Sequence, residues 1–187
     1  MAYLSMRAIA KMGFKQVGKN VLLSEKSSYY NTSNIVILDN SRIDDFCIIS
    51  AGVGGILIGR NVHIACYCSL IGSATITLDD FAGISSKTAI YSSNDDYSGE
   101  YLTGPTVPMQ FRNVNQAPVR IGKHVIVGSG SVILPGVTIN DISAVGALSV
   151  VNKDVLTGQV VGGTPAKFIK VRSTGLLNLE QQYLAHY

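Results

Sequence analysis

The sequence predicts an all-β solenoid, in which short strands wind around a triangular core. The first observation is an aliphatic residue at every sixth position, in runs that cover most of the chain. A period of six matches neither the roughly 3.6 residues of an α-helix nor the two of an ordinary strand, so each short strand must end in a turn. The second observation is a small or β-branched residue four positions after many of these, suited to a tight corner. The aliphatic series is Ile37, Ile43, Ile49, Ile58, Ile64, Leu70, Leu78, Ile84, Ile90, Ile121, Val127, Ile133, Ile139, Val145 and Val151, and the small series is Cys47, Val62, Cys68, Ala74, Ala82, Thr88, Val125, Ser131, Val137, Ser143, Ser149 and Val155.

Stacked coils account for this repeat. Aliphatic side chains of successive coils lie above one another in a continuous core, so each coil depends on its neighbours. Glycine or polar residues are expected at the turns, in fragments such as IGRNV, IGKHV and LPGVTI.

The flanks are expected to cap a single domain. Residues 1–20 form an N-terminal helical cap, in which Ser5 is suited to cap a helix over Met6 to Met12. The solenoid is expected over residues 21–172. Residues 173–187 are expected to form a helix that packs back on the coils through Leu176, Leu177, Leu179, Tyr183 and Leu184.

The composition argues against several classes of protein. With 187 residues, 47% of them hydrophobic and 14% charged, the chain is expected to bury a substantial core. The net charge of +3 gives no sign of nucleic acid binding, and no apolar run is long enough to predict a transmembrane segment. The N-terminus is too interrupted to predict a secretory signal. Cys47, Cys66 and Cys68 fit a reducing cytoplasm and are expected as small core residues rather than zinc ligands.

The repeats resemble those of the hexapeptide-repeat acyltransferases, whose fold is a left-handed parallel β-helix. The resemblance covers roughly residues 20–172, and its most specific part runs from VIVGSGSVILPGVTIN to VVGGTPAKFIK. That ending is similar to the terminal coil of acetyl-CoA-dependent sugar acetyltransferases. The resemblance implies a cytoplasmic homotrimer with active sites between subunits, acetyl-CoA or another acyl-CoA as co-substrate, and no metal. A role in polysaccharide biosynthesis is also implied by the resemblance alone.

Small residues on successive coils suit the arm of coenzyme A. Gly128 and Gly146 lie one coil of eighteen residues apart, so they are expected to stack in one track. The resemblance implies that Ser129, Gly146 and Ala147 contact the pantetheine arm. Cations for the nucleotide phosphates are expected from Lys153, Lys167 and Lys170.

The stretch AIYSSNDDYSGEYLTGPTVP, residues 89–108, breaks the repeat. The six-residue register is lost between Ile90 and Ile121, so a long loop is expected at about residues 92–120 on a binding face. Many members of the family carry a histidine just after the last repeat before this loop, as general base on a sugar hydroxyl. Ser92 or Ser93 stands at that place here, so the usual base is missing.

An amine acceptor lessens the need for that base. A neutral amine attacks a thioester directly and needs desolvation, alignment and a carboxylate that holds the departing proton. The acidic loop resembles that of nucleotide-sugar N-acyltransferases acting on 4-amino-4,6-dideoxy sugars. This resemblance places around the amine Asp95 or Asp96, Glu100, and Ser85 or Ser86. Further contacts with the sugar or nucleotide-sugar are expected from Ser93, Asn94, Tyr97 and Tyr101.

His63 supports an alternative function. It stands one coil before Ser85, where it could act as general base of a galactoside- or polysaccharide-type sugar O-acetyltransferase. His124 is expected on the surface, and His186 in a tail. A zinc hydratase would need close histidines, and a non-catalytic or ice-binding solenoid would need flat threonine rows, so both classes are disfavoured.

Overall fold

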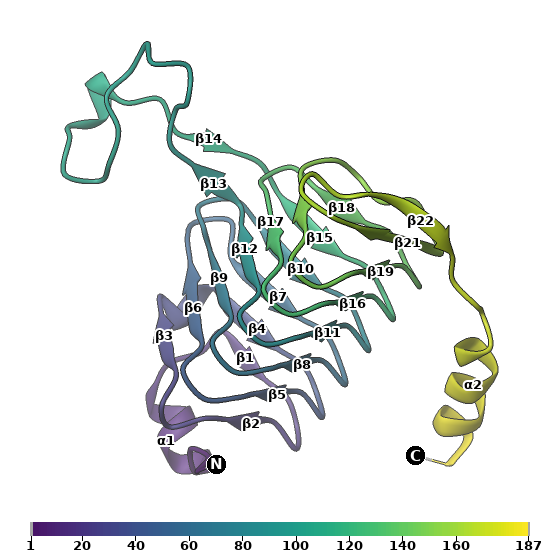
Figure 1. The fold of residues 1–187 in the computed structure, drawn as a ribbon. Coiled ribbons are helices and arrows are strands. Elements are labelled where there is room, and N and C mark those ends of the chain that lie inside the picture. The colour runs from purple at the N-terminus through teal and green to yellow at the C-terminus, as the bar shows by residue number, and fades with distance from the viewer. Residues whose placement is uncertain (1, 187) are drawn as a thin grey trace.

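The computed structural model describes residues 2–186 as a parallel β-solenoid with strands on three faces (Figure 1). Sheet 1 contains β1 (Gln16–Val17), β4 (Ile35–Ile37), β7 (Ile56–Ile58), β10 (Ile76–Leu78), β15 (Val119–Ile121) and β18 (Thr138–Ile139). Sheet 2 contains β2 (Leu22–Leu23), β5 (Arg42–Ile43), β8 (His63–Ile64), β11 (Gly83–Ile84), β16 (Ile126–Val127), β19 (Ala144–Val145), β21 (Gln159–Gly162) and β22 (Lys167–Val171). Sheet 3 contains β3 (Ser28–Tyr30), β6 (Ile48–Ala51), β9 (Ser69–Gly72), β12 (Ala89–Tyr91), β17 (Val132–Ile133) and β20 (Val150–Val151). Each coil thus contributes one strand to each sheet, and only β22 runs antiparallel to its neighbour within them.

The core is the stack of aliphatic residues that the repeat predicts. Every member of the aliphatic series is buried, with at most 3% of its surface exposed. The small series is buried as well, except for Ala74, which is half-buried where the long loop leaves the coil. Burial of a large aliphatic side chain stabilises a fold by roughly 1.5–3 kcal/mol, so this ladder is the main source of cohesion between coils.

The solenoid begins before residue 21. Strand β1 already pairs with β4 in parallel, so residues assigned to the cap belong to the first coil. The same six-residue spacing links Val17, Leu23 and Tyr29, and it would have extended the repeat had it been followed further.

The turns depart from the expected chemistry, because bulky residues occupy several of them. Phe46, Tyr67, Phe81 and His124 have left-handed backbone conformations, with φ between 58° and 62°. A side chain in this region costs roughly 1–2 kcal/mol. Phe46 stacks on Tyr67 at 5.0 Å, and Phe81 stacks on His124 at 4.9 Å, one coil apart in each case. Stacking between successive coils offsets part of that cost, so glycine is not required there.

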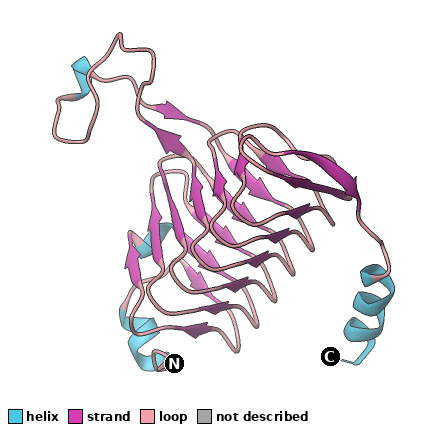
Figure 2. Ribbon diagram, in the orientation of Figure 1, coloured by secondary structure: helices cyan, strands magenta, loops and turns pink. Residues whose placement is uncertain are grey.

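Both terminal helices form, but they attach differently (Figure 2). In α1 (Met6–Lys11), the Ser5 hydroxyl accepts a hydrogen bond from the Ala8 amide at 3.2 Å, as the N-cap prediction requires. In α2 (Leu176–His186), Leu177, Leu179 and Leu184 are exposed, so the expected packing through the leucines is wrong.

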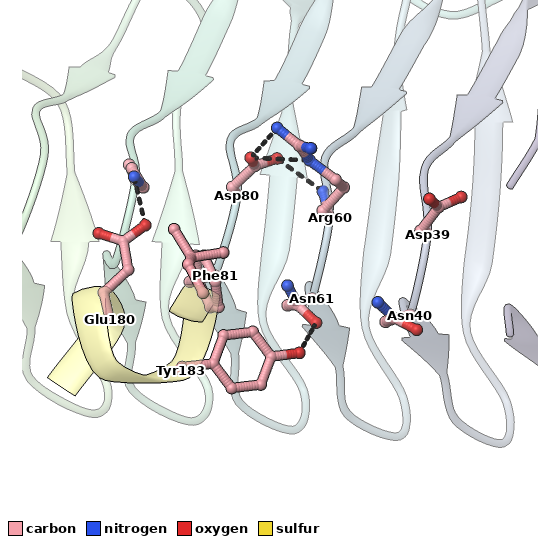
Figure 3. Close-up of a pocket in the computed structure, with 10 residues that line it drawn as sticks. Asp39, Asn40, Arg60, Asn61, Asp80, Phe81, Glu180 and Tyr183 are labelled. Carbon is pink, nitrogen blue, oxygen red and sulfur yellow. Dashed lines mark hydrogen bonds and ion pairs between the residues drawn. The ribbon is translucent and has the colours of Figure 1, made fainter. Parts of the chain in front are cut away.

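Polar and aromatic contacts hold α2 instead. The Tyr183 hydroxyl donates to Asn61 Oδ1 at 3.2 Å, and the Tyr183 ring meets Phe81 edge-on at 5.8 Å (Figure 3). Glu180 pairs with Lys123 and, at 2.9 Å, with His124 Nε2. The His124 side chain is therefore only 11% exposed, and its predicted surface position is wrong because α2 covers it.

Candidate active site

The turns between sheets 2 and 3, residues 85–88, 128–131 and 146–149, form an edge that we call the serine corner. Its coils are held by the Gly130 amide, which donates to the Ser86 carbonyl, and by the Leu148 amide, which donates to the Ser129 carbonyl. The Thr88 hydroxyl donates to the Ser85 carbonyl at 2.7 Å and fixes the first turn. Buried hydroxyls thus satisfy the turn backbone and leave the outer serine side chains for other contacts.

Ser85 and Ser86 lie together at this corner but differ in environment. The Ser86 hydroxyl lies 3.4 Å from Cys66 Sγ, whereas the Ser85 hydroxyl has no hydrogen-bond partner among residues 2–186. Cys47 and Cys68 are buried as predicted, but Cys66 is half-buried and faces the corner. The Ser85 hydroxyl is therefore available to a bound substrate.

His63 lies on the face of sheet 2 beside this corner. Its Nε2 lies 2.9 Å from Asp44 Oδ2 and 3.2 Å from Arg42 Nη2, while Arg42 Nε lies 2.8 Å from Asp44 Oδ1. Burial raises the pKa of Asp44, but hydrogen bonds from His63 and Arg42 outweigh it and hold that pKa below its ordinary value. Asp44 and Arg42 both contact Nε2, so they fix the ring and leave Nδ1 outside these contacts, in an orientation that a general base can use.

A hollow of about 290 Å³ brings the predicted groups together on this face. It is lined by His63 and Ser85 on successive coils, with Ser86 and Ser129 at the corner and Gly83 and Ile126 on the floor. One depression thus contains three groups that were predicted from separate parts of the sequence. They are the base His63, the amine-binding Ser85 and the pantetheine-binding Ser129.

The predicted coenzyme track continues from the hollow along sheet 2. Strand registers join, in order, His63, Gly83, Ile126, Ala144, Val160 and Lys170. Neighbouring strands lie about 4.8 Å apart, so Lys170 stands roughly 24 Å from His63. Ala147 lies exposed beside this line and Gly146 is half-buried there, and Lys167 and Lys170 in β22 are exposed at its far end. Lys153 is exposed too, but it follows β20 of sheet 3 and does not lie on this line. The arrangement suits a long ligand with an apolar arm and an anionic end.

Close stacking explains Gly128, the first glycine of this track. A Cβ on Gly128 would lie 2.5 Å from the amide nitrogen of Ala147 on the next coil. Only glycine permits this approach without a shift of the backbone.

The long loop leaves and re-enters the solenoid through a narrow neck. Strands β13 (Ser93–Asn94) and β14 (Asn115–Gln116) pair antiparallel, and the Ala117 amide donates to the Ser92 carbonyl at 3.1 Å. Beyond the neck the loop projects away from the coils, with a short 3₁₀ helix over Met109–Phe111 (Figure 1).

The predicted loop residues occupy distinct environments. Asp96 Oδ2 accepts hydrogen bonds from the Ser98 hydroxyl at 2.7 Å and from the Ser98 and Gly99 amides, and these lower the pKa of Asp96. Asp95 instead lines a cavity within the loop, together with Ser93 and Asn94. The exposed residues are Glu100, Tyr97 and Tyr101.

In one chain the loop carboxylates do not join Ser85 in the hollow. Strand β12 and its flanks separate Ser86 from Ser92, which at about 3.3 Å per residue is roughly 20 Å. Beyond β13 the loop then runs further outward (Figure 1). The acidic and serine-containing halves of the predicted site therefore lie on different edges of the solenoid.

Two functional neighbours were missed from the sequence. Arg42 pairs in register with His63 on the adjoining coil, and Asp44 follows it. Counting one coil back from His63 would have found both. The structure brings no group of three metal-ligating side chains together within residues 2–186, and no helix among them is long and apolar enough to cross a bilayer.

The fold and this hollow define a left-handed β-helix acyltransferase that uses an acyl-CoA. No protein-family model matches the chain. The chain is 50% identical over 183 residues to the dTDP-4-amino-4,6-dideoxy-D-glucose acyltransferase of Escherichia coli, covering 98% of this chain and 95% of that relative. This chain belongs to the family of that dTDP-4-amino-4,6-dideoxyglucose acyltransferase.

Solved structures agree with this assignment. Those of AntD, an N-acyltransferase from Bacillus cereus, superpose with a TM-score of 0.96 at 42% identity, covering 100% of this chain and at least 99% of that one. They contain coenzyme A with dTDP or with dTDP-4-amino-4,6-dideoxyglucose. A more distant relative from E. coli K-12, named for O-acetyl transfer in lipopolysaccharide biosynthesis, is 30% identical over 131 residues, which span 69% of this chain and 64% of that protein. The predicted fold and acyltransferase class are confirmed.

Proposed function

We propose that this enzyme transfers an acyl group from an acyl-CoA to the 4-amino group of a dTDP-linked 4-amino-4,6-dideoxy sugar. The observation that carries the proposal is the hollow in which His63, Ser85 and Ser129 meet at the head of a small-residue track. The acceptor named for the E. coli relative and bound in an AntD structure supports the amine over a hydroxyl.

The chemistry proceeds by direct attack of the neutral amine. Nitrogen forms a bond to the thioester carbonyl carbon, the carbon–sulfur bond breaks, and coenzyme A leaves as thiolate. The proton lost from nitrogen ends on that sulfur, directly or by way of Asp95 or His63. Ser85 hydrogen-bonds the amine or the carbonyl oxygen, so the protein supplies alignment and proton handling rather than a nucleophile.

The spacing of residues altered in AntD supports this assignment. Single substitutions were made there in one serine and one aspartate, ten positions apart. Ser85 and Asp95 share that spacing, as do Ser86 and Asp96. The free Ser85 hydroxyl and the engaged Asp96 carboxylate favour the first pair.

We further propose that the two halves of the site come from different chains of a homotrimer. The separation of roughly 20 Å along β12 places Asp95 out of reach of an amine held at Ser85 of the same chain. A loop that projects from the solenoid is suited to reach a neighbouring hollow. Nucleotide sugars and acyl-CoA both point to the cytoplasm and to the biosynthesis of surface polysaccharide.

The direct test is an acceptor panel with acetyl-CoA and longer acyl-CoAs. We expect turnover of the dTDP-linked amino sugar and little of the matched sugar with a hydroxyl at the same carbon. Turnover of hydroxyl sugars alone would contradict the proposal.

The His63–Asp44 pair favours a second candidate, O-acetylation with His63 as general base. In a His63→Gln variant, direct amine attack predicts partial activity, because the amine needs no strong base. Loss of nearly all activity toward every acceptor would favour the histidine mechanism.

A further inference from the structure

The loop and the adjoining coil, through Ile71 and Ser73, line an open cavity of about 720 Å³ that shares no lining residue with the serine corner. We call it the loop cavity; its polar lining includes Asn94, Asp95 and Arg112, and Met109 and Val114 supply apolar surface. A cation, a carboxylate and an amide that line one cavity together with apolar side chains suit a ligand with an anionic middle and two different ends.

Arg112 is poorly satisfied in this cavity. Its Nη1 donates to the Gly104 carbonyl at 3.3 Å, but its Nε is buried without a hydrogen-bond partner, and no carboxylate of residues 2–186 pairs with it. Asn94 Oδ1 is also buried without a partner in the described chain. A buried polar group left unsatisfied costs roughly 1–3 kcal/mol, so both atoms favour a ligand that completes them.

The local fold holds Arg112 in place. The 3₁₀ helix over Met109–Phe111 ends there, and the Arg112 amide donates to the Met109 carbonyl. The main chain of Arg112 is held in this way, and its planar guanidinium matches two oxygens of a phosphate or diphosphate.

A second groove offers a contrast. The groove between α2 and the turns of sheets 1 and 2 has a volume of about 320 Å³ (Figure 3). Its two cations are already paired, Arg60 with Asp80 at 3.2 Å and Lys123 with Glu180. The further carboxylate of Asp39 makes its lining net acidic, so it repels a diphosphate.

We infer that Arg112 binds the diphosphate of the nucleotide-sugar acceptor in the loop cavity. This inference rests on the proposed function and assigns a subsite within it. Asn94 and Asp95, at the neck of the loop, then face the sugar end, and the apolar wall is left for the pyrimidine ring. The loop thus binds the nucleotide part of the acceptor, while the solenoid holds the acyl donor and, through Ser85, the amine.

The test compares dTDP with thymidine by isothermal titration calorimetry, in the intact enzyme saturated with coenzyme A. A charge-assisted hydrogen bond contributes about 1.5–3 kcal/mol, so Arg112→Gln should weaken dTDP binding roughly 10- to 150-fold. Thymidine binding should not change. Arg112→Lys should fall between, since it keeps the charge and loses the planar fork. Arg60→Gln, in the other groove, is the matched control and should bind dTDP like the wild type.

Several outcomes would overturn the inference. The first is an Arg112→Gln variant that binds dTDP with wild-type affinity. The second is an equal loss of thymidine affinity in that variant, which would indicate a collapsed loop. The third is loss of dTDP binding in Arg60→Gln. The proposed function fails separately. If the enzyme binds dTDP through Arg112 but does not acylate the amino sugar, the diphosphate subsite is supported and the proposed acceptor is wrong.

Discussion

If the active site is shared between chains, two inactive variants should restore activity when they assemble together. Ser85→Ala removes the hydroxyl from the hollow, and Asp95→Ala removes the loop carboxylate. Loss of a group that positions or moves a proton typically costs 10²–10⁴-fold in rate, so each variant alone should be nearly inactive. In a cyclic assembly every site pairs the hollow of one chain with the loop of the next.

The size of the recovery follows from this geometry. In an equal, random mixture, half of the hollows retain Ser85 and half of the loops that reach them retain Asp95. About one site in four then carries both groups, so activity should return to about a quarter of the wild-type value. The assay is acyl transfer to the dTDP-linked amino sugar after the two chains are co-refolded or co-expressed.

The control replaces one partner with the double variant Ser85→Ala, Asp95→Ala. Mixed with Ser85→Ala, it cannot form an intact site, and its activity should stay at the level of the parents. No recovery in the test mixture would refute the shared site, because both groups would then be needed within one chain. Full activity of either parent alone would refute the role of that residue.

Three further predictions concern stability and the coenzyme track. Ile64→Ala, in the fully buried ladder, should lower the free energy of unfolding by about 2–5 kcal/mol in urea titrations, and an unchanged midpoint would contradict the ladder. Gly128→Ala should weaken coenzyme A binding and lower the melting temperature, because its Cβ would meet the backbone of Ala147 at 2.5 Å. Gly146→Ala should lower both by less, because its Cβ would meet its nearest atom at 3.5 Å. Burial raises the pKa of Glu180, but hydrogen bonds from Lys123 and His124 outweigh this and lower it. Docking of α2 is therefore stable above the ordinary pKa of glutamate, about 4.3, and is lost as pH falls through the lower folded value. Amide hydrogen exchange of the helix should show this loss, and Glu180→Gln should abolish its pH dependence.

The sequence predicted the coils well because one physical requirement recurs in each of them. Every coil must bury one aliphatic residue per side. Each such residue, for example Ile64 or Ile84, therefore indicates an inward-facing strand position, and the spacing between two of them predicts which strands pair. The same spacing also placed His63 beside Ser85, because coil length converts sequence distance into strand pairing.

Other features depend on contacts that no period reveals. His124 looked exposed in its turn, yet a helix more than fifty residues later covers it through Glu180. Phe46 and Phe81 occupy turns where glycine or a polar residue was expected, because stacking on the next coil compensates for their backbone conformations. Arg112 carried no sequence signal, since its isolation within a cavity arises only when the loop is folded.

The neck of the loop has an evolutionary consequence. Strand β10 pairs with β15 in parallel across the insertion, so the hydrogen-bond ladder of sheet 1 continues as though the loop were absent. Each doubling of loop length costs only about 0.6 kcal/mol of closure entropy. Segments of different length and composition can therefore be exchanged at Ser92 and Ala117 while the solenoid keeps its packing. Such an exchange would change the surface that we propose for the nucleotide part of the acceptor and would leave the strand pairing of sheet 2, along which we predict the acyl donor, unchanged.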